Sequence, residues 1–337
     1  EGREPKAVLS PLPSALCAIL SSVFDLIQAD LTSFEGNLAK TLRSSVEFIE
    51  AIGDDLVTAG GKRLRPSLSF LAGKLLNADP EMTMRVALSV ELLHSASLLH
   101  DDLIDDADTR RGREAAFRRY GNVVSVMSGD FMLAKMFEII AEANSSELIR
   151  LISYTAANIC EGEVLQFQMA TLETYSFENY FRVIDGKTAV LVAAALEGVA
   201  ILANASREQR EALKTYGMSY GRAFQMQDDH LDLLGNEEKL GKPIGGDLRE
   251  GKATYSSLVL FDKGVDEART IVRRHAKQAD DVKKMIALVK EHGADVDAKN
   301  QIISEAKKAI QVLDIFPDSL AKQHLIQLAT REIERAK

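Results

Sequence analysis

Two acidic segments with the same spacing are the residues of this chain best suited to chemistry. The first runs from Asp101 to Asp105 (DDLID) and the second from Asp228 to Asp232 (DDHLD). Positions i and i+4 of an α-helix lie on one face, about one turn apart, so each segment places two carboxylates on one helical surface. Both segments lie within apolar runs, where an unpaired charge is costly. The sequence therefore predicts two carboxylate pairs that require a cation.

The chemistry of carboxylate oxygens indicates which cation this is. Oxygen ligands favour a hard ion, and magnesium is commonly bound by one or two carboxylates together with substrate phosphates. Neither segment has the alternating Asp/Asn and Gly spacing of a calcium-binding EF-hand loop. In a chain with 50 Asp and Glu, a single acidic cluster would indicate a solvated helix face. Two clusters with identical spacing and apolar flanks indicate a paired magnesium site instead.

A turn rich in glycine and basic residues precedes the first acidic segment. The glycines at 60–61 end one helix, and Pro66 suits the first turn of the next. Lys62 and Arg65 are then expected at a helix N-terminus, where backbone N–H groups and the helix dipole favour an anion. We expect Arg63, between them, to face solvent.

Seven short motifs accompany the two acidic segments. They are GGKRLRP at 60–66, ELLH at 91–94, DTRRG at 108–112, GKT at 186–188, FQ at 224–225, GKP at 241–243 and DLREGK at 247–252. In content and order, the motifs and the acidic segments resemble the trans-prenyltransferases, the polyprenyl diphosphate synthases. The resemblance covers residues 60–252. It implies an all-α fold, a single-domain bundle of antiparallel helices around a deep central cavity.

The resemblance also implies a magnesium-dependent reaction between isopentenyl diphosphate and an allylic diphosphate. Three magnesium ions are expected, and manganese can replace them. The metal-binding residues would be Asp101, Asp102, Asp105, Asp228, Asp229 and Asp232. Withdrawal of charge from the leaving diphosphate by the metals would favour an allylic cation. The residues that act in this step would be Asp101, Asp105 and Asp228, with Lys187 and Gln225.

Two separate diphosphate sites follow from the same resemblance. The allylic diphosphate would be bound by Arg110, Lys187, Thr188, Gln225 and Lys242. Isopentenyl diphosphate would be bound without metal by Lys62, Arg65, His94 and Arg111. Two diphosphates held at separate ends leave the hydrocarbon ends facing each other, which lowers the barrier by orientation.

Two small residues upstream of Asp101 bear on product length. Ala96 and Ser97 lie about 6–7.5 Å along the helix from Asp101, on the path of a growing tail. In the family, short-chain enzymes block this path with bulky aromatics or carry an insertion in the first acidic motif. We therefore expect a long-chain all-trans product, of heptaprenyl to decaprenyl type, and a farnesyl or geranylgeranyl product is the alternative. The tail would stop at deeper side chains such as Phe137, Ile140, Ile152 or Tyr154.

Two other functions share part of this pattern. A class I terpene cyclase uses the same first motif, but it usually has an Asn/Ser/Glu motif in second place. It also has no need of a second diphosphate site such as Lys62, Arg65 and Arg111 provide. A non-catalytic partner subunit of a two-component synthase usually loses its Asp-rich motifs, and both are intact in this chain.

Composition excludes several classes of protein. Hydrophobic residues make up 46% of the 337 residues and aromatics only 6%, with Ala and Leu abundant, which favours helix over sheet. The net charge of −9 argues against nucleic acid as a partner. Cys17 and Cys160 are too few for a disulfide framework. The most apolar stretch, 189–203, contains Glu197 and is predicted to be a buried core helix.

We expect a cytoplasmic homodimer with at most peripheral membrane contact for product release.

The periodicity of apolar residues defines the expected elements. Residues 1–13 contain three prolines and are expected to be a poorly ordered leader or expression remnant, followed by one all-α domain over 14–337. No paired strands are expected, and the glycine-rich segment 235–251 is predicted to be a mobile loop. Helical segments are predicted at 14–29, 37–57, 82–105, 123–143, 148–172, 177–204, 209–234 and within 255–337.

Overall fold

The structure, a computed structural model, describes residues 14–58, 60–110, 113–237 and 243–336. The expected leader over 1–13 lies outside these ranges, and so do Arg111 and Lys242. The expectation of one domain over 14–337 stays a prediction.

The described residues form an array of helices, which confirms the all-α fold. A two-residue hairpin pairs β1 (Thr109–Arg110) with β2 (Arg113–Glu114), and short turns of π-helix (η1, Asp185–Ala189) and 3-10 helix (η2, Val312–Ile315) interrupt the α-helices. The α-helices are α1 (Ser14–Thr41), α2 (Glu47–Thr58), α3 (Leu64–Leu76), α4 (Pro80–Ile104), α5 (Ala116–Tyr120), α6 (Asn122–Glu142), α7 (Ser146–Leu172), α8 (Phe177–Ile184), α9 (Val190–Leu202), α10 (Arg207–Leu234), α12 (Gly246–Arg249), α13 (Tyr255–Asp262), α14 (Asp266–Arg273), α15 (Asp281–Glu291), α16 (Ala294–Gln311) and α17 (Leu320–Ala336).

The first helix is longer than the sequence pattern predicted. α1 continues to Thr41 because Ile27, Leu31, Phe34 and Leu38 form one buried stripe at helical spacing. The chain then breaks before α2, so the predicted helix over 37–57 is wrong at its start.

Three other local predictions need correction. The β1–β2 hairpin contradicts the expectation that no strands pair, and it is stabilised by backbone pairing of Thr109 with Glu114. The predicted helix over 177–204 is divided by the π turn η1. Within the segment 235–251, predicted to be a loop, Gly246–Arg249 form the single helical turn α12. Residues 238–242 of this segment lie outside the described ranges, and its predicted mobility stays a prediction.

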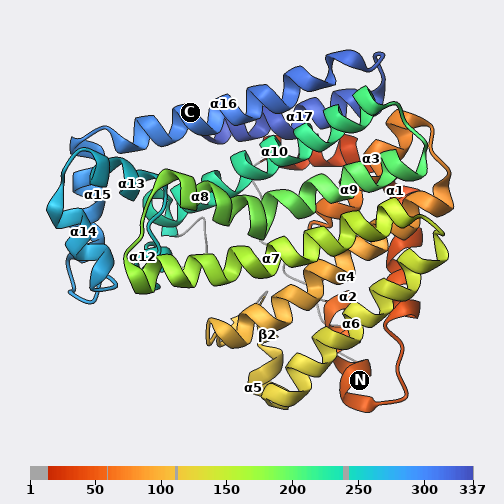
Figure 1. Cartoon of the computed structure of the whole chain (residues 1–337), viewed down its shortest axis with the longest axis horizontal. Helices are drawn as coiled ribbons and strands as arrows, with labels where there is room; N and C mark the ends of the chain where they lie inside the picture. Colours follow the sequence, from red (N-terminus) through yellow and green to blue (C-terminus); the bar gives the residue numbers. More distant parts are fainter. Residues whose placement is uncertain (1–13, 59, 111–112, 238–242, 337) are drawn as a thin grey trace, which may run out of the picture.

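Helix α9 forms the centre of the larger hydrophobic cluster. Its residues from Val190 to Ile201 are all buried, which confirms the predicted core helix. It packs against α3, α4, α7 and α10, and Figure 1 shows it in green between α7 and α10. A second cluster joins α13–α16 to the ends of α8 and α10, at the left of Figure 1. Within the described part of the chain, none of the helices combines the length and apolar character needed to cross a bilayer.

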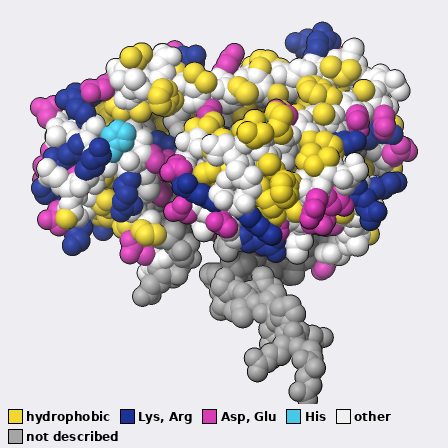
Figure 2. Space-filling model, turned by 90° about the horizontal axis from the view of Figure 1, so that it is seen from below, with side chains coloured by type: hydrophobic (Ala, Val, Ile, Leu, Met, Phe, Trp, Pro, Cys, Tyr) yellow, Lys and Arg dark blue, Asp and Glu magenta, His cyan; other side chains and the backbone are white. Residues whose placement is uncertain are grey.

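Apolar side chains are also exposed along two neighbouring helices. Val123, Met127 and Phe137 of α6 and Val164 and Phe167 of α7 are each at least half exposed. The space-filling view from below shows apolar side chains grouped over the right half of that face, with charged residues around them (Figure 2).

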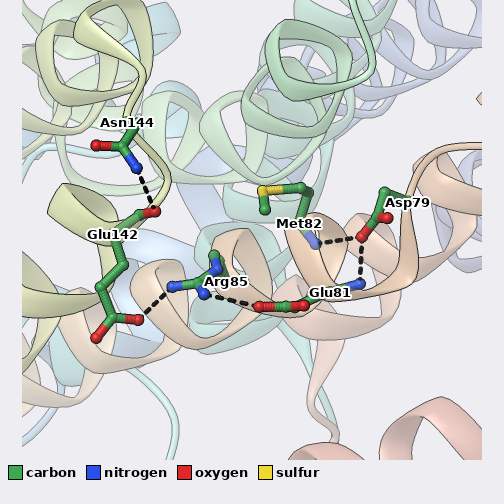
Figure 3. Close-up of polar contacts among 6 residues, drawn as sticks. All are labelled: Asp79, Glu81, Met82, Arg85, Glu142 and Asn144. Atoms are coloured by element: carbon green, nitrogen blue, oxygen red, sulfur yellow. Dashed lines mark hydrogen bonds and ion pairs between the residues drawn. The ribbon is translucent and has the colours of Figure 1, made fainter.

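The N-terminal end of α4 is anchored by a polar network (Figure 3). Asp79 caps the helix, because its carboxylate accepts hydrogen bonds from the backbone N–H groups of Glu81 (2.8 Å) and Met82 (3.0 Å). Arg85 donates to Glu81 (2.7 Å) and pairs with Glu142 at the end of α6. These contacts fix α4 at the end opposite to its aspartates.

Glycines allow α9 and α10 to approach each other closely. A Cβ atom at Gly217 would lie 2.4 Å from the Cα atom of Ala193, and one at Gly221 would lie 2.6 Å from the Cα atom of Ala189. Gly36, on the exposed face of α1, has no atom within 4 Å of a built Cβ.

We expect Gly217→Ala to lower the free energy of unfolding by about 1–3 kcal/mol, because the backbones of α9 and α10 must move apart. Gly36→Ala is the matched control and should raise it by about 0.5–1 kcal/mol, through reduced entropy of the unfolded chain. Urea unfolding of both variants measures the difference. Equal stability of Gly217→Ala and the unmodified chain would contradict this packing.

Candidate functional site

The first acidic segment forms the C-terminal end of α4. Asp101 is half-buried in the last turn and Asp105 is the exposed residue that ends the helix. Asp102 is 3% exposed and accepts a hydrogen bond from Nε of Arg110 (2.7 Å). The carboxylates that remain available for a metal ion on this segment are therefore those of Asp101 and Asp105.

The second acidic segment lies in the last two turns of α10. Asp229 accepts hydrogen bonds from the hydroxyl of Tyr180 (2.7 Å) and from Nε2 of Gln225 (2.8 Å). Gln225 in turn accepts one from the hydroxyl of Thr188 (2.7 Å). These bonds bring together three residues that the sequence predicted for one site, and they fix the orientation of the Gln225 amide.

The other two aspartates of α10 have different surroundings. Asp232 is buried and accepts a hydrogen bond from the backbone N–H of Asp247 (3.0 Å). Asp228 is exposed, and its Oδ1 atom lies 3.6 Å from Nη2 of Arg335 in α17. Asp228 thus faces the solvent-accessible side of the site.

A cavity of about 210 Å³, named the acidic cavity because it lies against the second acidic segment, has both aspartates and lysines in its wall. Its wall includes Asp229, Asp247, Lys187, Lys252 and Gln225. Burial, reinforced by repulsion from Asp229 and Asp232, raises the pKa of Asp247 to about 8. Burial also raises the pKa of Asp229 to about 6. Carboxyl groups with raised pKa values are stabilised by an added cation.

Asp101 shows the same effect on the opposite helix. Burial raises its pKa to about 6, and repulsion from Glu163 and Asp105 adds to the shift. The positive charges of Lys187 and Arg110 act to lower the pKa of Asp101. Lys187 therefore acts on the first acidic segment and also lines the cavity beside the second.

The π turn η1 places Lys187 and Thr188 at this site. Such turns are rare and are often found at functional sites. The backbone of Gly186 packs against α7 so closely that a Cβ atom would lie 2.6 Å from the carbonyl oxygen of Asn158. The ammonium group of Lys187 pairs with Glu163 and lies 3.4 Å from Oε1 of Gln166.

A second, larger cavity of about 640 Å³ is rich in basic side chains. Lys62, Arg65 and His94 line it together, as the sequence predicted for one binding site. Lys62 and Arg65 lie at the start of α3, with Pro66 in the first turn, which confirms the predicted helix N-terminus. Arg331 and Arg335 of α17 line the same cavity.

Arg110 lies between the two sites. It lines the basic cavity with Lys62, whereas the other residues predicted for the allylic diphosphate, Lys187 and Gln225, line the acidic one. Its guanidinium is held by Asp102. The positive charge of Arg110 also acts to lower the pKa of Asp101 in the first acidic segment.

The prediction that Arg63 faces solvent is wrong. Arg63 is 6% exposed and bonds to Glu35 and Glu91. Burial acts to lower the pKa of Arg63, but the bonds to both carboxylates outweigh this and raise it. No partner of Arg63 could be identified from the sequence, because Glu35 and Glu91 are each 28 residues away.

Several site residues were not assigned from the sequence. They are Tyr180, Asp247, Lys252, Arg331 and Arg335. Asp247 and Lys252 stand in a quoted motif without an assigned role. Arg331 and Arg335 are four residues apart and share one face of α17, and this spacing was an available signal.

The residues predicted to control product length have contrasting positions. Ala96 is 1% exposed within the larger hydrophobic cluster, and Ser97 is half-buried. Ile140 and Ile152 are buried, whereas Phe137 and Tyr154 are 50% and 63% exposed. Within the single chain, Phe137 and Tyr154 are therefore not part of a buried wall.

The donor set fits magnesium held together with a substrate. Within the described ranges, no group of three or more His, Cys, Asp or Glu side chains is arranged to hold a metal ion. Magnesium keeps several waters and is usually bound by one or two carboxylates plus phosphate oxygens. Pairs of carboxylates on α4 and α10 meet that requirement.

Comparison with known proteins agrees with this geometry. The family model described as polyprenyl synthetase matches residues 46–290. The octaprenyl diphosphate synthase of Haemophilus influenzae is 35% identical over 94% of this chain and 97% of its own length. The geranylgeranyl diphosphate synthase of Methanosarcina mazei is 35% identical over 83% of this chain and 87% of its own.

Solved structures show the same fold. A polyprenyl synthase from Caulobacter crescentus, crystallised with calcium and isoprenyl diphosphate, has a TM-score of 0.86 and 34% identity, with 94% of this chain and 98% of that chain covered. The family uses divalent metals with diphosphate substrates. The match over most of the chain shows that this protein belongs to the polyprenyl synthetase family and is a prenyltransferase of the polyprenyl diphosphate synthase group.

Proposed function

We propose that this chain condenses isopentenyl diphosphate with an allylic diphosphate to form a long-chain all-trans polyprenyl diphosphate. The observation that carries the proposal is the pair of unlike cavities beside α10. Phe224 lines the basic cavity, and the next residue, Gln225, lines the acidic one. Two diphosphates can then bind on either side of one helical turn, with their hydrocarbon ends close together.

The basic cavity suits isopentenyl diphosphate, which needs no metal. Lys62, Arg65 and His94 provide donors from α3 and α4, and Arg331 and Arg335 add guanidinium groups from α17. Arginine binds phosphate through paired, charge-assisted hydrogen bonds. Arg111, outside the described residues, is proposed for the same site from its motif.

The acidic cavity suits an allylic diphosphate bound with magnesium. Asp101, Asp105 and Asp228 are the proposed ligands, with Asp102, Asp229 and Asp232 beside them. Bound magnesium would withdraw charge from the leaving diphosphate. Three ions are proposed, and manganese is expected to replace them.

Basic and polar side chains of the chain assist ionisation. When the allylic C–O bond breaks, its electron pair leaves with the diphosphate, and Lys187 and Lys252 hold fixed positive charge at that cavity. Lys242 is proposed for the same role and lies outside the described residues. Thr188 and Asp229 hold the Gln225 amide in one orientation beside the cavity.

Bond formation then requires only that the two substrates are oriented toward each other. The double-bond electrons of isopentenyl diphosphate attack the allylic cation, one proton is lost to the released diphosphate, and a new double bond forms. No nucleophilic side chain takes part. A terpene cyclase would not use the basic cavity, and a non-catalytic subunit would not use the two intact acidic segments.

Product length is proposed from the small residues before Asp101. Ala96 and Ser97 have small side chains, so α4 itself presents no bulky group at these two positions. A relative named for a long-chain product and one named for a short-chain product are each 35% identical to this chain, so percentage identity does not distinguish the two products. The short-chain product is therefore the second candidate.

A homodimer is proposed from the exposed apolar residues of α6 and α7. Patches of this kind mark protein interfaces. Phe137 of α6 and Phe167 of α7 are 50% and 72% exposed. Cytoplasmic location is proposed from the composition alone.

Activity should require magnesium or manganese and should be lost when a chelator is added. Asp101→Ala and Asp228→Ala should each lower kcat by several orders of magnitude, because each removes a ligand that neutralises the leaving group. Steady-state assays with radiolabelled isopentenyl diphosphate measure this, and the exposed Asp262→Ala is the control. Full activity without divalent metal would refute the ionisation mechanism.

Lys62→Ala and Arg65→Ala should raise KM for isopentenyl diphosphate far more than KM for the allylic primer. Each lost charged hydrogen bond is worth about 1.5–3 kcal/mol, or roughly a tenfold to hundredfold effect. Initial rates with each substrate varied in turn give the two constants. Equal increases in both would show that the two diphosphate sites are wrongly assigned.

Ala96→Phe should shorten the product toward farnesyl or geranylgeranyl length while the first condensation survives. Because Ala96 is buried, Ser97→Phe at the half-buried neighbour is a second variant that perturbs the core less. Mass analysis of the products determines their length. A short product from the unmodified chain, or unchanged products from both folded variants, would exclude the long-chain assignment.

A further inference from the structure

Arg63 is 6% exposed and lies in the wall of the basic cavity, where three helices converge. Its Nε and Nη2 atoms donate to the two carboxylate oxygens of Glu35 in α1, at 2.6 and 3.0 Å. Its Nη1 atom donates to Glu91 in α4 at 2.6 Å. Nη2 also lies 3.5 Å from the carbonyl oxygen of Leu56 in α2. Each nitrogen of the guanidinium is thus engaged within the protein.

The backbone of Arg63 is in an unusual conformation. Its φ of 42° and ψ of 39° lie in the left-handed region, which side chains other than glycine, asparagine and aspartate seldom adopt. Arg63 is the residue before α3, and its side chain makes no capping bond to that helix. The contacts with Glu35 and Glu91 hold this turn together with the hydrogen bond from the backbone N–H of Ser67 to the carbonyl oxygen of Arg63 (2.9 Å).

The turn carries the residues proposed to bind isopentenyl diphosphate. Lys62 precedes Arg63 directly, and Arg65 follows two positions later. Glu91 lies one turn before His94 on α4, and both line the basic cavity. One guanidinium thus connects the α3 donors to the α4 donor.

Charge gives Arg63 a second effect on the same cavity. The side chain of Glu91 is 4% exposed and lies in the cavity wall. Without Arg63, a buried and uncompensated carboxylate would repel a bound diphosphate.

We propose that Arg63 is a positioning residue for the isopentenyl diphosphate site, one that orients Lys62 and Arg65 and neutralises Glu91 without touching the substrate. This inference rests on the proposed function. It differs from the roles of Lys62 and Arg65, whose side chains would contact the diphosphate directly.

Two variants test the inference. Arg63→Met keeps the length of the side chain and removes its charge. We expect KM for isopentenyl diphosphate to rise about tenfold or more, with kcat and KM for the allylic primer changed by less than about twofold. Glu35→Gln removes the negative charge of one partner of Arg63, and Glu35 is not part of the basic cavity wall. It should raise the same KM by about threefold to tenfold.

Conservative and control variants separate positioning from general stability. Arg63→Lys should recover only part of the affinity, because an ammonium group cannot reproduce the paired geometry. Arg210→Met breaks a comparable ion pair with the buried Glu197 (3.0 Å), away from the basic cavity. It should lower the melting temperature and leave KM for isopentenyl diphosphate unchanged.

The outcomes distinguish the inference from the proposed function. If Arg63→Met and Glu35→Gln lower the melting temperature as Arg210→Met does, but leave KM for isopentenyl diphosphate unchanged, the positioning role is wrong. Equal increases in KM for both substrates would also overturn it. Lys62→Ala and Arg65→Ala are measured in the same assay. If neither raises KM for isopentenyl diphosphate, the site itself is wrongly assigned, and the proposed role of Arg63 is then wrong as well.

Discussion

The C-terminal ends of α4 and α10 both carry aspartates, and the rest of the structure depends on holding this negative charge together. A helix C-terminus already has a partial negative charge, equivalent to about half an elementary charge, from its unpaired carbonyl groups. Acidic residues there are therefore unfavourable on two counts. Arg110 beside Asp102 and Arg335 beside Asp228 compensate part of the charge. Burial, with a smaller contribution from neighbouring carboxylates, raises the pKa values of Asp101, Asp229 and Asp247, and this favours binding of a divalent cation with a phosphate ligand.

A rigid apolar framework keeps the two acidic helix ends in place. α9 is buried along most of its length, and glycines let α10 lie directly against it. At its far end, α4 is capped by Asp79 and tied to α6 through Arg85. Neither α4 nor α10 can move away from α9 without loss of core packing. Close packing of this kind transmits little displacement, so the carboxylates keep their relative positions.

The basic cavity is assembled from parts of the chain that are far apart in sequence. Lys62 and Arg65 come from the start of α3, His94 from the middle of α4, and Arg331 and Arg335 from the last helix. This arrangement separates a site rich in cations from a site rich in carboxylates by little more than α10. Separation by charge type allows two diphosphates to be distinguished, one bound through metal and the other through basic side chains alone.

Local sequence determined the helices and the two acidic segments at their ends, because side-chain spacing over a few residues sets which face of a helix is apolar. The glycines and Pro66 likewise placed Lys62 and Arg65 at a helix N-terminus. Tertiary structure alone decided the burial of Arg63 and the participation of Arg335. Glu35 and Glu91 lie 28 positions from Arg63, and Asp228 is far from Arg335 in the sequence, so these charges become paired only when packed helices bring them within reach. Helix formation follows from neighbours along the chain, whereas the environment of a charge depends on which distant side chains surround it.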